Sequence, residues 1–474
     1  MIHIHTRDNK LNISYFNEKG LVEIDRYEIP KNEMYEWSTL DKSKSRKYKE
    51  VNWYDQNVTK TPTTRSLSKF RIQEYMEQNQ HIFSKYNKYN FPKIWYCDIE
   101  TAFVNGTYSK PENADNPVLS IALVSNTGNI ICLGLKPVSN IEGLKNNVKE
   151  HLKPIYKDTD DIQLKYKSFE NEYDMMYYFF GELLPNIGCL TGWNFTEYDW
   201  MYLANRAIKL NIEPKIASPV RDYANRKTYI PLHKLIVDYM FIFGKWDKSL
   251  KVKENLSLDY ISSEVLGVKK VKYSDSLHNL YTKNFDEFIY YNIIDTFLVK
   301  LIEDKVKLFN VVLKLANNAL VPIERGFKPV TMTESHYNRE FIKRGQIFSS
   351  KIRSTEDIES DSLELIGGYV SDVEPGKYKW VACLDFSSLY PSIQMQFNIS
   401  PDTLLPKEKA KLLIESGKRV AKCASGFYFD NEKDSVARVV LKRLFTERKQ
   451  IQKQWKSIEY EISNLEKELQ QLND

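Results

Sequence analysis

Apolar residues follow two kinds of pattern along the chain, one that predicts strands and one that predicts helices. Short runs rich in β-branched and aromatic residues are typical of strands, whereas apolar residues three and four positions apart are typical of helices. From about residue 93 to about residue 308 the two kinds alternate, which is the pattern of an α/β domain. Strands are predicted at 11–15, 21–27, 93–101, 118–124, 130–135, 189–194 and 380–384, helices at 148–156, 170–184, 196–210, 284–308 and 438–456, and a hairpin at 221–233.

Two acidic residues interrupt the predicted buried strand Lys93–Thr101. Asp98 and Glu100 are two positions apart, so their side chains point to the same face of the strand. Two buried carboxylates side by side repel each other and lose their hydration. A divalent cation relieves both costs, because hard cations bind carboxylate oxygens. The alternative is a strand end at which both acids reach water, and these residues alone leave the choice open.

Two later segments add acids that suit the same site. Asp199 lies near the start of a predicted helix, and Tyr291 and Asp295 lie four positions apart on one face of another. By itself, a buried Tyr beside an Asp is more often a structural hydrogen bond. Taken with the strand pair, however, the acids can hold two metal ions that activate a water and stabilise a leaving oxygen on phosphorus. Tyr291 would then orient the attacking water.

The overall composition limits the function classes without choosing one. The chain has 474 residues and a formal net charge of +5, which predicts several domains and permits a nucleic-acid partner. Its five cysteines are far apart and odd in number, which argues against a disulfide framework or a zinc site and favours a reduced cytoplasm. No run reaches the ~18 apolar residues of a membrane span, and the N-terminus lacks a signal-peptide core, so no membrane partner is expected.

Three motifs in the chain resemble those of the proofreading 3′–5′ exonuclease of family B DNA polymerases. They are Asp-Ile-Glu at 98–100, Asn-Phe-Thr-Glu-Tyr-Asp at 194–199 and Tyr-Asn-Ile-Ile-Asp at 291–295. Nearby segments such as Thr-Gly-Trp-Asn at 191–194 are similar to segments of the replicative polymerases of T-even-type phages. The resemblance implies an RNase-H-like exonuclease fold with two bound Mg²⁺ or Mn²⁺ ions. The implied metal ligands are Asp98, Glu100, Asp199 and Asp295, with Tyr291 as a catalytic residue and Asn194 as a substrate-binding residue.

A second candidate site follows the predicted strand at 380–384. From the residues alone, Asp385 at a strand end is more often structural, and Pro391 suits the first turn of a helix. However, Asp-Phe-Ser-Ser-Leu-Tyr-Pro-Ser at 385–392 resembles motif A of the family B palm, and Gly-Gly-Tyr-Val at 367–370 matches its lead-in. The resemblance implies that Asp385 binds the catalytic metals and that Tyr390 stacks on the sugar of an incoming dNTP. The implied triphosphate-binding amides are those of Ser387, Ser388 and Leu389.

The predicted C-terminal helix has a basic face. A solvated helix is the simpler reading of such a face. However, Leu-Phe-Thr-Glu-Arg-Lys at 444–449 resembles the start of the polymerase fingers, where Arg448 matches an arginine that contacts the triphosphate. The family usually has a lysine four residues later, and this chain has Gln452 there. Lys453 lies one position further on, about 100° around the helix, which leaves its role open.

Further along the same helix, apolar residues follow a coiled-coil spacing and predict a partner helix. A stripe of this kind exposes apolar surface unless another helix covers it. The second palm carboxylate of the family does not follow Asp385; Tyr-Lys-Asp-Thr-Asp-Asp at 156–161 resembles that motif but suits a surface turn. We therefore hypothesise a split polymerase, with an artificially truncated chain as the alternative. The stripe consists of Ile451, Trp455, Ile458, Ile462, Leu465, Leu469 and Leu472.

The resemblance implies a multidomain α/β and α+β protein. Its expected parts are an N-terminal domain (1–92 and 309–356), an exonuclease domain (93–308), a partial palm (357–434) and the first half of the fingers (435–474). The expected partners are primer-template DNA, a single-stranded 3′ end, a sliding clamp, and a second polypeptide with the remaining fingers, palm and thumb. The expected location is the cytoplasm, that of an infected bacterium if the chain is from a phage. The alternative function is a catalytically incomplete nucleic-acid-binding protein or translational repressor.

Overall fold

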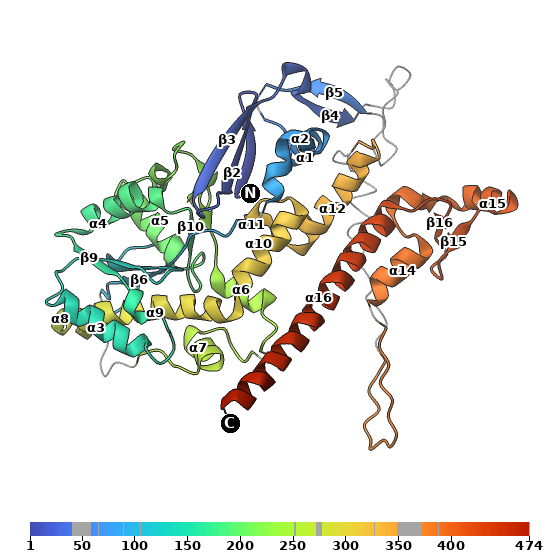
Figure 1. Cartoon of the computed structure of the whole chain (residues 1–474). Helices are drawn as coiled ribbons and strands as arrows, with labels where there is room; N and C mark the ends of the chain where they lie inside the picture. The colour runs from blue at the N-terminus through green and yellow to red at the C-terminus, as the bar shows by residue number, and fades with distance from the viewer. Residues whose placement is uncertain are drawn as a thin grey trace. The chain divides into compact units, whose positions relative to one another are not determined.

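The computed structural model describes residues 1–39, 58–64, 66–88, 90–104, 106–250, 253–271, 277–326, 328–347, 371–386 and 388–473. These residues form two compact units, which Figure 1 follows from the blue N-terminus to the red C-terminus. The four domains predicted from the sequence stay predictions. The first unit comprises Met1–Met34, Thr64–Ser66 and Gln80–Thr333, and the second comprises Tyr35–Thr63, Leu67–Asn79 and Glu334–Asp474.

A six-stranded mixed sheet forms the centre of the first unit. In order across the sheet, its strands are β13 (Leu235–Ile236), β10 (Cys189–Thr191), β6 (Ile94–Thr101), β7 (Val118–Ser125), β8 (Ile130–Gly134) and β9 (Leu164–Ser168). β7 pairs antiparallel with β6 and β8, whereas the other neighbours are parallel. Every residue of β7 is buried, as expected for a strand covered on both faces. The predicted strands that correspond to β6, β7 and β8 are thus confirmed.

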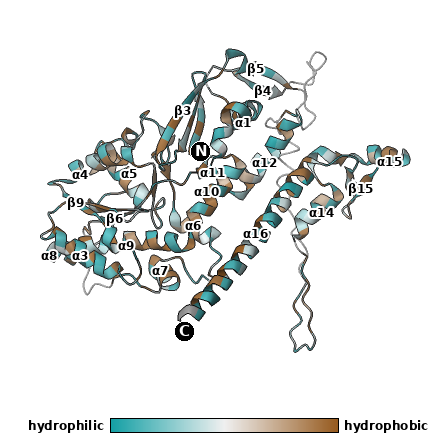
Figure 2. Ribbon diagram, in the orientation of Figure 1, coloured by the Kyte–Doolittle hydropathy of each residue, from teal (hydrophilic) through white to brown (hydrophobic). Residues whose placement is uncertain are grey.

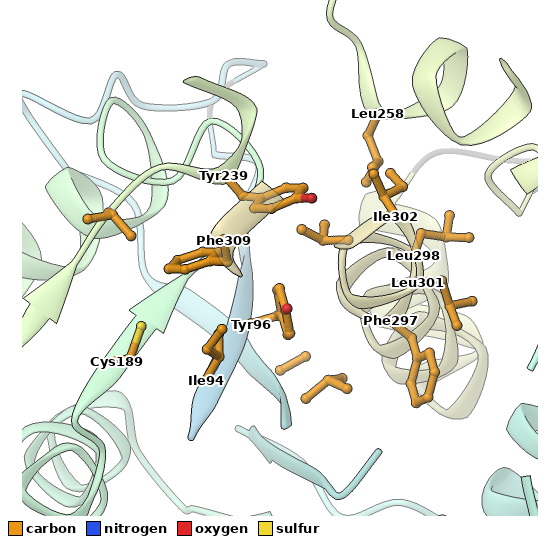
Figure 3. Packing of buried hydrophobic residues seen from close by; sticks show 14 of the residues in the cluster. Ile94, Tyr96, Cys189, Tyr239, Leu258, Phe297, Leu298, Leu301, Ile302 and Phe309 are labelled. Carbon is orange, nitrogen blue, oxygen red and sulfur yellow. The ribbon is translucent and has the colours of Figure 1, made fainter. Parts of the chain in front are cut away.

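The side chains of β6 alternate between two apolar clusters, one on each face of the sheet. Ile94 and Tyr96 belong to the cluster that Figure 3 shows beside helix α9 (Phe285–Val306). Trp95, Cys97 and Ile99 belong to the cluster on the other face. This alternation explains why the sequence of β6 is almost continuously apolar.

Helices cover both faces of this sheet. α9 packs along β6 and β7, and its burial over most of its length explains the weak periodicity of its sequence. The predicted helix 284–308 is thereby confirmed. The other helices of the unit are α2 (Gln80–Phe83), α3 (Ile141–Leu152), α4 (Glu172–Tyr178), α5 (Asp199–Lys209), α6 (Tyr239–Trp246), α7 (Leu258–Leu266), α8 (Leu277–Lys283), α10 (Leu308–Ala319) and α11 (Ile323–Gly326).

Two predicted helices have different starts in the structure. α3 begins at Ile141 instead of Val148, because the side chain of Asn140 caps it by accepting a bond from the Gly143 amide at 2.8 Å. α5 begins at Asp199, three residues after the predicted start at Thr196. The amide of Thr196 donates to Asp238 at 3.1 Å, which holds it in the turn before the helix.

A smaller antiparallel sheet begins the first unit. Its strands pair in the order of the sequence, which confirms the predicted strands at 11–15 and 21–27. The predicted hairpin at 221–233 is also confirmed, although both of its strands are short. The strands are β1 (His3–Arg7), β2 (Lys10–Phe16) and β3 (Val22–Glu28) in the sheet, and β11 (Tyr223–Asn225) and β12 (Ile230–Pro231) in the hairpin.

The second unit contains two small sheets and the longest described helix. Phe341 packs against Val436 and Val440 near the start of that helix. The strands are β4 (Tyr35–Thr39), β5 (Val58–Pro62), β14 (Leu404–Leu405), β15 (Val420–Lys422) and β16 (Tyr428–Asp430). The helices are α1 (Lys69–Gln78), α12 (Pro329–Lys343, of which the residues from Glu334 on belong to this unit), α14 (Leu389–Phe397), α15 (Lys407–Glu415) and α16 (Val436–Asn473).

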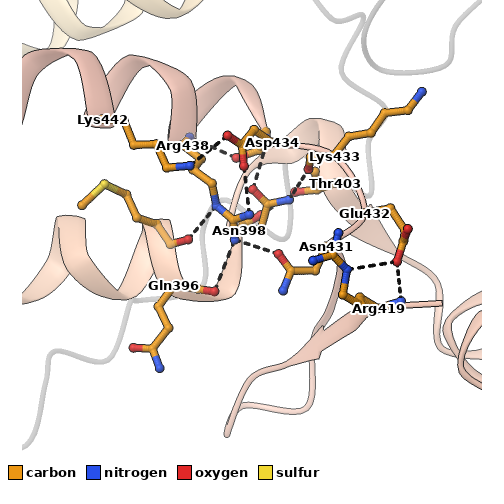
Figure 4. Close-up of polar contacts among 12 residues, drawn as sticks. Gln396, Asn398, Thr403, Arg419, Asn431, Glu432, Lys433, Asp434, Arg438 and Lys442 are labelled. Carbon is orange, nitrogen blue, oxygen red and sulfur yellow. Dashed lines mark hydrogen bonds and ion pairs between the residues drawn. The ribbon is translucent and has the colours of Figure 1, made fainter. Parts of the chain in front are cut away.

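Polar contacts anchor the start of α16 to the small sheet and to α14, as Figure 4 shows. The side-chain amide of Asn398 donates to the carbonyls of Asp430 at 2.6 Å and Lys433 at 2.8 Å. Arg438 donates to the Met395 carbonyl at 2.6 Å and to Asn431 at 2.8 Å. The first turn of α16 is therefore fixed in position by hydrogen bonds. The predicted helix 438–456 is confirmed.

Beyond its first turn, α16 carries an exposed apolar stripe. Figure 2 shows apolar and polar residues alternating along the helix. Six stripe residues, from Ile451 to Leu469, are 49–65% exposed. Nothing among the described helices is both long enough and apolar enough to cross a membrane.

The strand predicted at 380–384 is wrong in this structure. Residues 371–386 follow an irregular path, and Trp380 is 99% exposed with a left-handed φ of 61°. A strand needs neighbours that pair with its backbone and cover its apolar side chains. No neighbouring strand pairs with this segment in the described part of the chain, so its apolar composition alone does not form a strand.

Candidate active site

Four carboxylates from three separate elements face one another in the first unit. Asp98 and Glu100 continue the face of β6 that α9 covers, Asp199 is the first residue of α5, and Asp295 lies within α9. Charge repulsion links Asp98 to Asp295 and to Asp199, and links Glu100 to both Asp98 and Asp295. Asp199 and Asp295 are 4% and 3% exposed. The structure therefore brings together all four acids that the sequence predicted.

Hydrogen bonds fix two of these carboxylates. The amide of Ile99 donates to Asp199 Oδ1 at 3.2 Å, which ties the start of α5 to β6. Asn292 Nδ2 donates to Asp98 Oδ2 at 2.7 Å, and Ser120 Oγ donates to Asn292 Oδ1 at 2.9 Å. Because Asn292 is fully buried, this chain of bonds holds Asp98 between β7 and α9. Sequence reasoning missed Asn292, although it lies inside the motif at 291–295.

A lysine supplies positive charge to the cluster. Lys270 Nζ lies 2.6 Å from Asp295 Oδ2 and 5.4 Å from the centroid of the Tyr291 ring. Burial alone would lower the pKa of Lys270, but Asp295, Asp98 and Glu100 raise it. The other oxygen of Asp295, Oδ1, is buried and has no hydrogen-bond partner among the described residues. Sequence reasoning also missed Lys270, because no local pattern signals a lysine that meets α9 only after folding.

Burial and mutual repulsion hold protons on these acids. Burial, followed by the charge of Asp295, raises the pKa of Asp98 to about 7 from an ordinary value of 3.8. Burial and neighbouring carboxylates also raise the pKa of Glu100 and Asp199. A cation among the oxygens would remove this cost.

The donor set fits divalent metal ions. Carboxylate oxygens, one of them buried without a partner, suit Mg²⁺ or Mn²⁺. Within the described residues, however, no three acidic, histidine or cysteine side chains already lie at metal-binding distances. The fit therefore depends on the chemistry and burial of the oxygens, and their final positions would change when the ions bind.

The raised pKa values predict a pH-dependent stability of the metal-free protein. A folded-state pKa of about 7 for Asp98, above its ordinary 3.8, gives stability that is complete at low pH and is lost as the pH rises through about 7. The melting temperature in a chelator should thus fall between about pH 5 and about pH 8. Asp98→Asn, which cannot ionise, should flatten this fall. Equal slopes for the Asn variant and the parent would contradict the prediction.

Replacing Lys270 should destabilise the metal-free protein. Lys270→Met removes a charged hydrogen bond from Asp295, which is expected to cost about 1.5–3 kcal/mol in free energy of unfolding. Urea unfolding in a chelator measures this loss, and excess Mg²⁺ should recover part of it. Lys269→Met, at the exposed neighbouring position, is the matched control. A loss of the same size in that control would show that the pair with Asp295 is not the cause.

The two remaining residues predicted for the exonuclease site, Tyr291 and Asn194, lie on or next to the elements that carry the acids. Tyr291 is one helical turn before Asp295 on α9, and its hydrogen bond lowers the pKa of Asp295 against the larger effect of burial. Asn194 lies in the turn between β10 and α5 with a left-handed φ of 56°, and its carbonyl accepts from the Tyr198 amide at 3.0 Å. The turn residue therefore belongs to the same strand-to-helix connection as Asp199.

The polymerase-type residues of the second unit are not assembled into a site. Asp385 lies within the irregular segment 371–386, Ser387 lies outside the described residues, and Ser388 is the N-cap of α14 with a left-handed φ of 54°. The side chain of Tyr390 is exposed on α14, and that of Arg448 is exposed on α16. Among the described residues, no hydrogen bond or ion pair joins Asp385 to Arg448. Leu389 is the first residue of α14.

The motif at 156–161 is a surface turn, as the sequence predicted. Its residues Thr159–Asp161 form one turn of 3-10 helix, and its aspartates are exposed. The segment lies between α3 and β9, without the hairpin strands that the palm motif would need.

Comparisons with known proteins find two family matches in separate parts of the chain. Residues 34–228 match the family description "DNA polymerase family B, exonuclease domain", and residues 326–473 match "DNA polymerase family B". The chain is 27% identical over 400 residues to a DNA-directed DNA polymerase of Escherichia phage RB69, covering 77% of this chain and 42% of that protein. It is 27% identical over 328 residues to DNA polymerase 1 of Sulfolobus acidocaldarius, covering 65% of this chain and 34% of that protein.

A third relative shows the same partial coverage. The DNA-directed DNA polymerase of Enterobacteria phage T4 is 24% identical over 307 residues, which cover 60% of this chain and 33% of that protein. The chain thus spans less than half the length of these curated relatives.

Proposed function

Because the chain belongs to DNA polymerase family B and contains the exonuclease domain of that family, we propose that its first unit is a proofreading 3′–5′ exonuclease. It hydrolyses the last phosphodiester bond at a single-stranded 3′ end of DNA. The observation that carries this proposal is the set of four carboxylates from β6, α5 and α9, in which, beyond the effect of burial, Asp98 raises the pKa of Glu100 and Asp199, and Asp295 raises that of Asp98.

In this proposal, Asp98, Glu100, Asp199 and Asp295 hold two Mg²⁺ or Mn²⁺ ions. When bound, such ions supply a water of lowered pKa and stabilise charge on the leaving oxygen. Asn292 holds Asp98 in place, and the link from Ile99 to Asp199 holds α5 against β6. Tyr291 orients the attacking water, one turn from Asp295. Asn194 contacts the substrate from the turn before α5.

Lys270 has a double role in this scheme. Its ammonium balances Asp295 before metal binding, since the two groups lie 2.6 Å apart. With metal bound, the same ammonium is close enough to the carboxylates to favour the negatively charged phosphate of the substrate. The lysine therefore joins the residues proposed from the sequence.

For the second unit, we propose one half of a polymerase active site. Asp385 binds catalytic metal, the amides of Ser387, Ser388 and Leu389 bind the triphosphate of a dNTP, Tyr390 stacks on its sugar, and Arg448 contacts its phosphates. The exposed stripe of α16 supports a missing partner helix, because apolar side chains at coiled-coil spacing are normally covered. We propose that a second polypeptide supplies this helix with the remaining palm and thumb. Primer-template DNA and a sliding clamp complete the assembly, in the cytoplasm of an infected bacterial cell.

The direction and metal dependence of DNA degradation test the nuclease proposal. A single strand labelled at its 5′ end should give a ladder of products shortened from the 3′ end in Mg²⁺ and none in a chelator. A matched strand blocked at the 3′ end by a phosphorothioate linkage should be degraded far more slowly. Binding of both strands without degradation would instead favour the nucleic-acid-binding or translational-repressor alternative.

A further inference from the structure

Three of the chain's seven histidines gather at one place in the first unit. His3 and His5 lie two positions apart on β1, and His233 lies between β12 and β13. The ring of His233 lies 6.3 Å from that of His3 and 5.6 Å from that of His5, centroid to centroid. When two imidazoles bind one ion with bonds of about 2.0–2.1 Å, their centroids are about 5–6 Å apart. The spacing is therefore close to that of rings sharing a metal ion.

Two nitrogens of this cluster lack the partners that buried polar atoms normally have. Nδ1 of His5 and Nδ1 of His233 are buried without a hydrogen bond to any described residue. The His233 residue is 1% exposed, and its backbone has a left-handed φ of 69°. A non-glycine residue keeps such a conformation only where its surroundings hold it, often at a ligand site. Two buried ring nitrogens without partners in the described part of the chain thus indicate that a ligand of the cluster is missing.

The third ring has its tautomer set by the backbone. His3 Nε2 lies 3.0 Å from the Lys234 carbonyl, which can only accept, so Nε2 carries a proton. In the neutral ring, Nδ1 is then a lone pair, and it lies 3.6 Å from Glu324 Oε2. Two acceptors face each other, which requires a cation between them, either a proton or a metal ion. A ring N–H held by a backbone carbonyl is also the usual support of a metal-binding histidine.

We propose that His3, His5, His233 and Glu324 bind one transition-metal ion, for which Zn²⁺ is the best match. Three imidazoles and one carboxylate suit its tetrahedral coordination. Because no described trio of such side chains already lies at coordination distance, the rings must turn about their side-chain bonds to meet the ion. The bound ion would join β1 to α11 and to the turn before β13, and so act as a structural clip.

The neighbouring charges permit a cation at this place. Lys234 directs its ammonium to the carbonyls of Pro185 at 2.6 Å and Ile187 at 2.9 Å. Arg7 lies 3.8 Å from Asp222, so their charges offset each other. Arg26 is a further cation near His233. Burial, together with His5, His3, Arg26 and Lys234, lowers the pKa of that ring, so the ring is neutral and can bind a metal ion.

Zn²⁺ titration of the untagged, full-length protein tests the proposal. The parent for the test carries Asp98→Ala and Glu100→Ala, so that the exonuclease carboxylates do not compete for the ion. Calorimetry should find one Zn²⁺ per chain, and Co²⁺ should give the absorption bands of a tetrahedral site. His5→Gln and Glu324→Gln should each weaken Zn²⁺ binding at least about tenfold, because even indirect supports of a metal site change affinity by about 10–100-fold.

The controls distinguish a specific Zn²⁺ site from nonspecific Zn²⁺ binding by surface histidines. His81→Gln, at an exposed position of α2, should leave Zn²⁺ affinity unchanged. Glu324 is 42% exposed on its side chain, so its variant is expected to fold even if a change at His5 does not. The proposal fails if the parent binds no Zn²⁺, if the variants bind it as the parent does, or if His81→Gln weakens binding equally. A Zn²⁺-induced rise in melting temperature, present in the parent and absent in Glu324→Gln, gives a second readout.

Discussion

Replacing Asp98 and Glu100 together by alanine should abolish Mg²⁺-dependent degradation of single-stranded DNA and leave the fold intact. Both side chains leave the same face of β6, so the double change removes half of the four carboxylates without touching a cluster of apolar residues. Loss of an indirect support at a metal site costs about 10–100-fold, and loss of two ligands should cost at least about 100-fold. The rate of product release from a labelled strand measures the effect.

Stability measurements make this result specific. Because burial raises the pKa of both acids, the double variant should be no less stable than the parent above pH 7 in a chelator. Asp158→Ala with Asp160→Ala, at exposed positions of the turn near α3, is the matched control and should degrade DNA at the parental rate. Unchanged degradation by the Asp98 and Glu100 variant would refute the assignment of the site.

The second large effect concerns DNA synthesis. The 474-residue chain alone should not extend a primer, whereas addition of a second polypeptide with the remaining palm and fingers should give extension. The reason is that phosphoryl transfer uses metals held by more than one carboxylate, and Asp385 is exposed in an irregular segment. Primer extension with and without the second polypeptide measures the difference, which should be all or none. Extension by the chain alone would show that its palm is complete by another route.

Changes on α16 test the proposed contact with a second polypeptide. Ile458→Asp with Leu465→Asp places two charges on the exposed stripe and should prevent both association and primer extension. Ser457→Asp with Gln471→Asp adds the same charges away from the stripe and should leave both intact. Exonuclease activity, which we propose for the first unit, should survive either change. Equal extension by the two double variants would show that the stripe is not the contact.

Local sequence patterns singled out the four acids that the fold brings together, and the reason is physical. Asp98 and Glu100 interrupt an apolar strand at the strand period, so their common face follows from β geometry. Asp295 interrupts a helix that is buried over most of its length. At both positions an acid occurs where an apolar residue would have a lower free-energy cost of burial. This mismatch is visible in the sequence before the fold is known.

Other parts of the site depend on tertiary contacts and carry no such signal. Lys270 lies outside any regular element and meets Asp295 only when α9 packs beside it. Asn292 reads as a polar residue in a helix until its bonds to Ser120 and Asp98 are seen. The strand predicted around Trp380 failed for the related reason that a strand needs neighbours, which local composition cannot supply. The sequence pattern thus identifies polar side chains at positions that are normally apolar, whereas tertiary contacts determine which of those side chains lie together.

Crystals soaked in Mn²⁺ test the central claim most directly, because the anomalous signal of the metal locates it without assumptions about the protein. The account predicts two Mn²⁺ ions bound among the oxygens of Asp98, Glu100, Asp199 and Asp295. An empty pocket at saturating Mn²⁺, or carboxylates that stay dispersed, would contradict it.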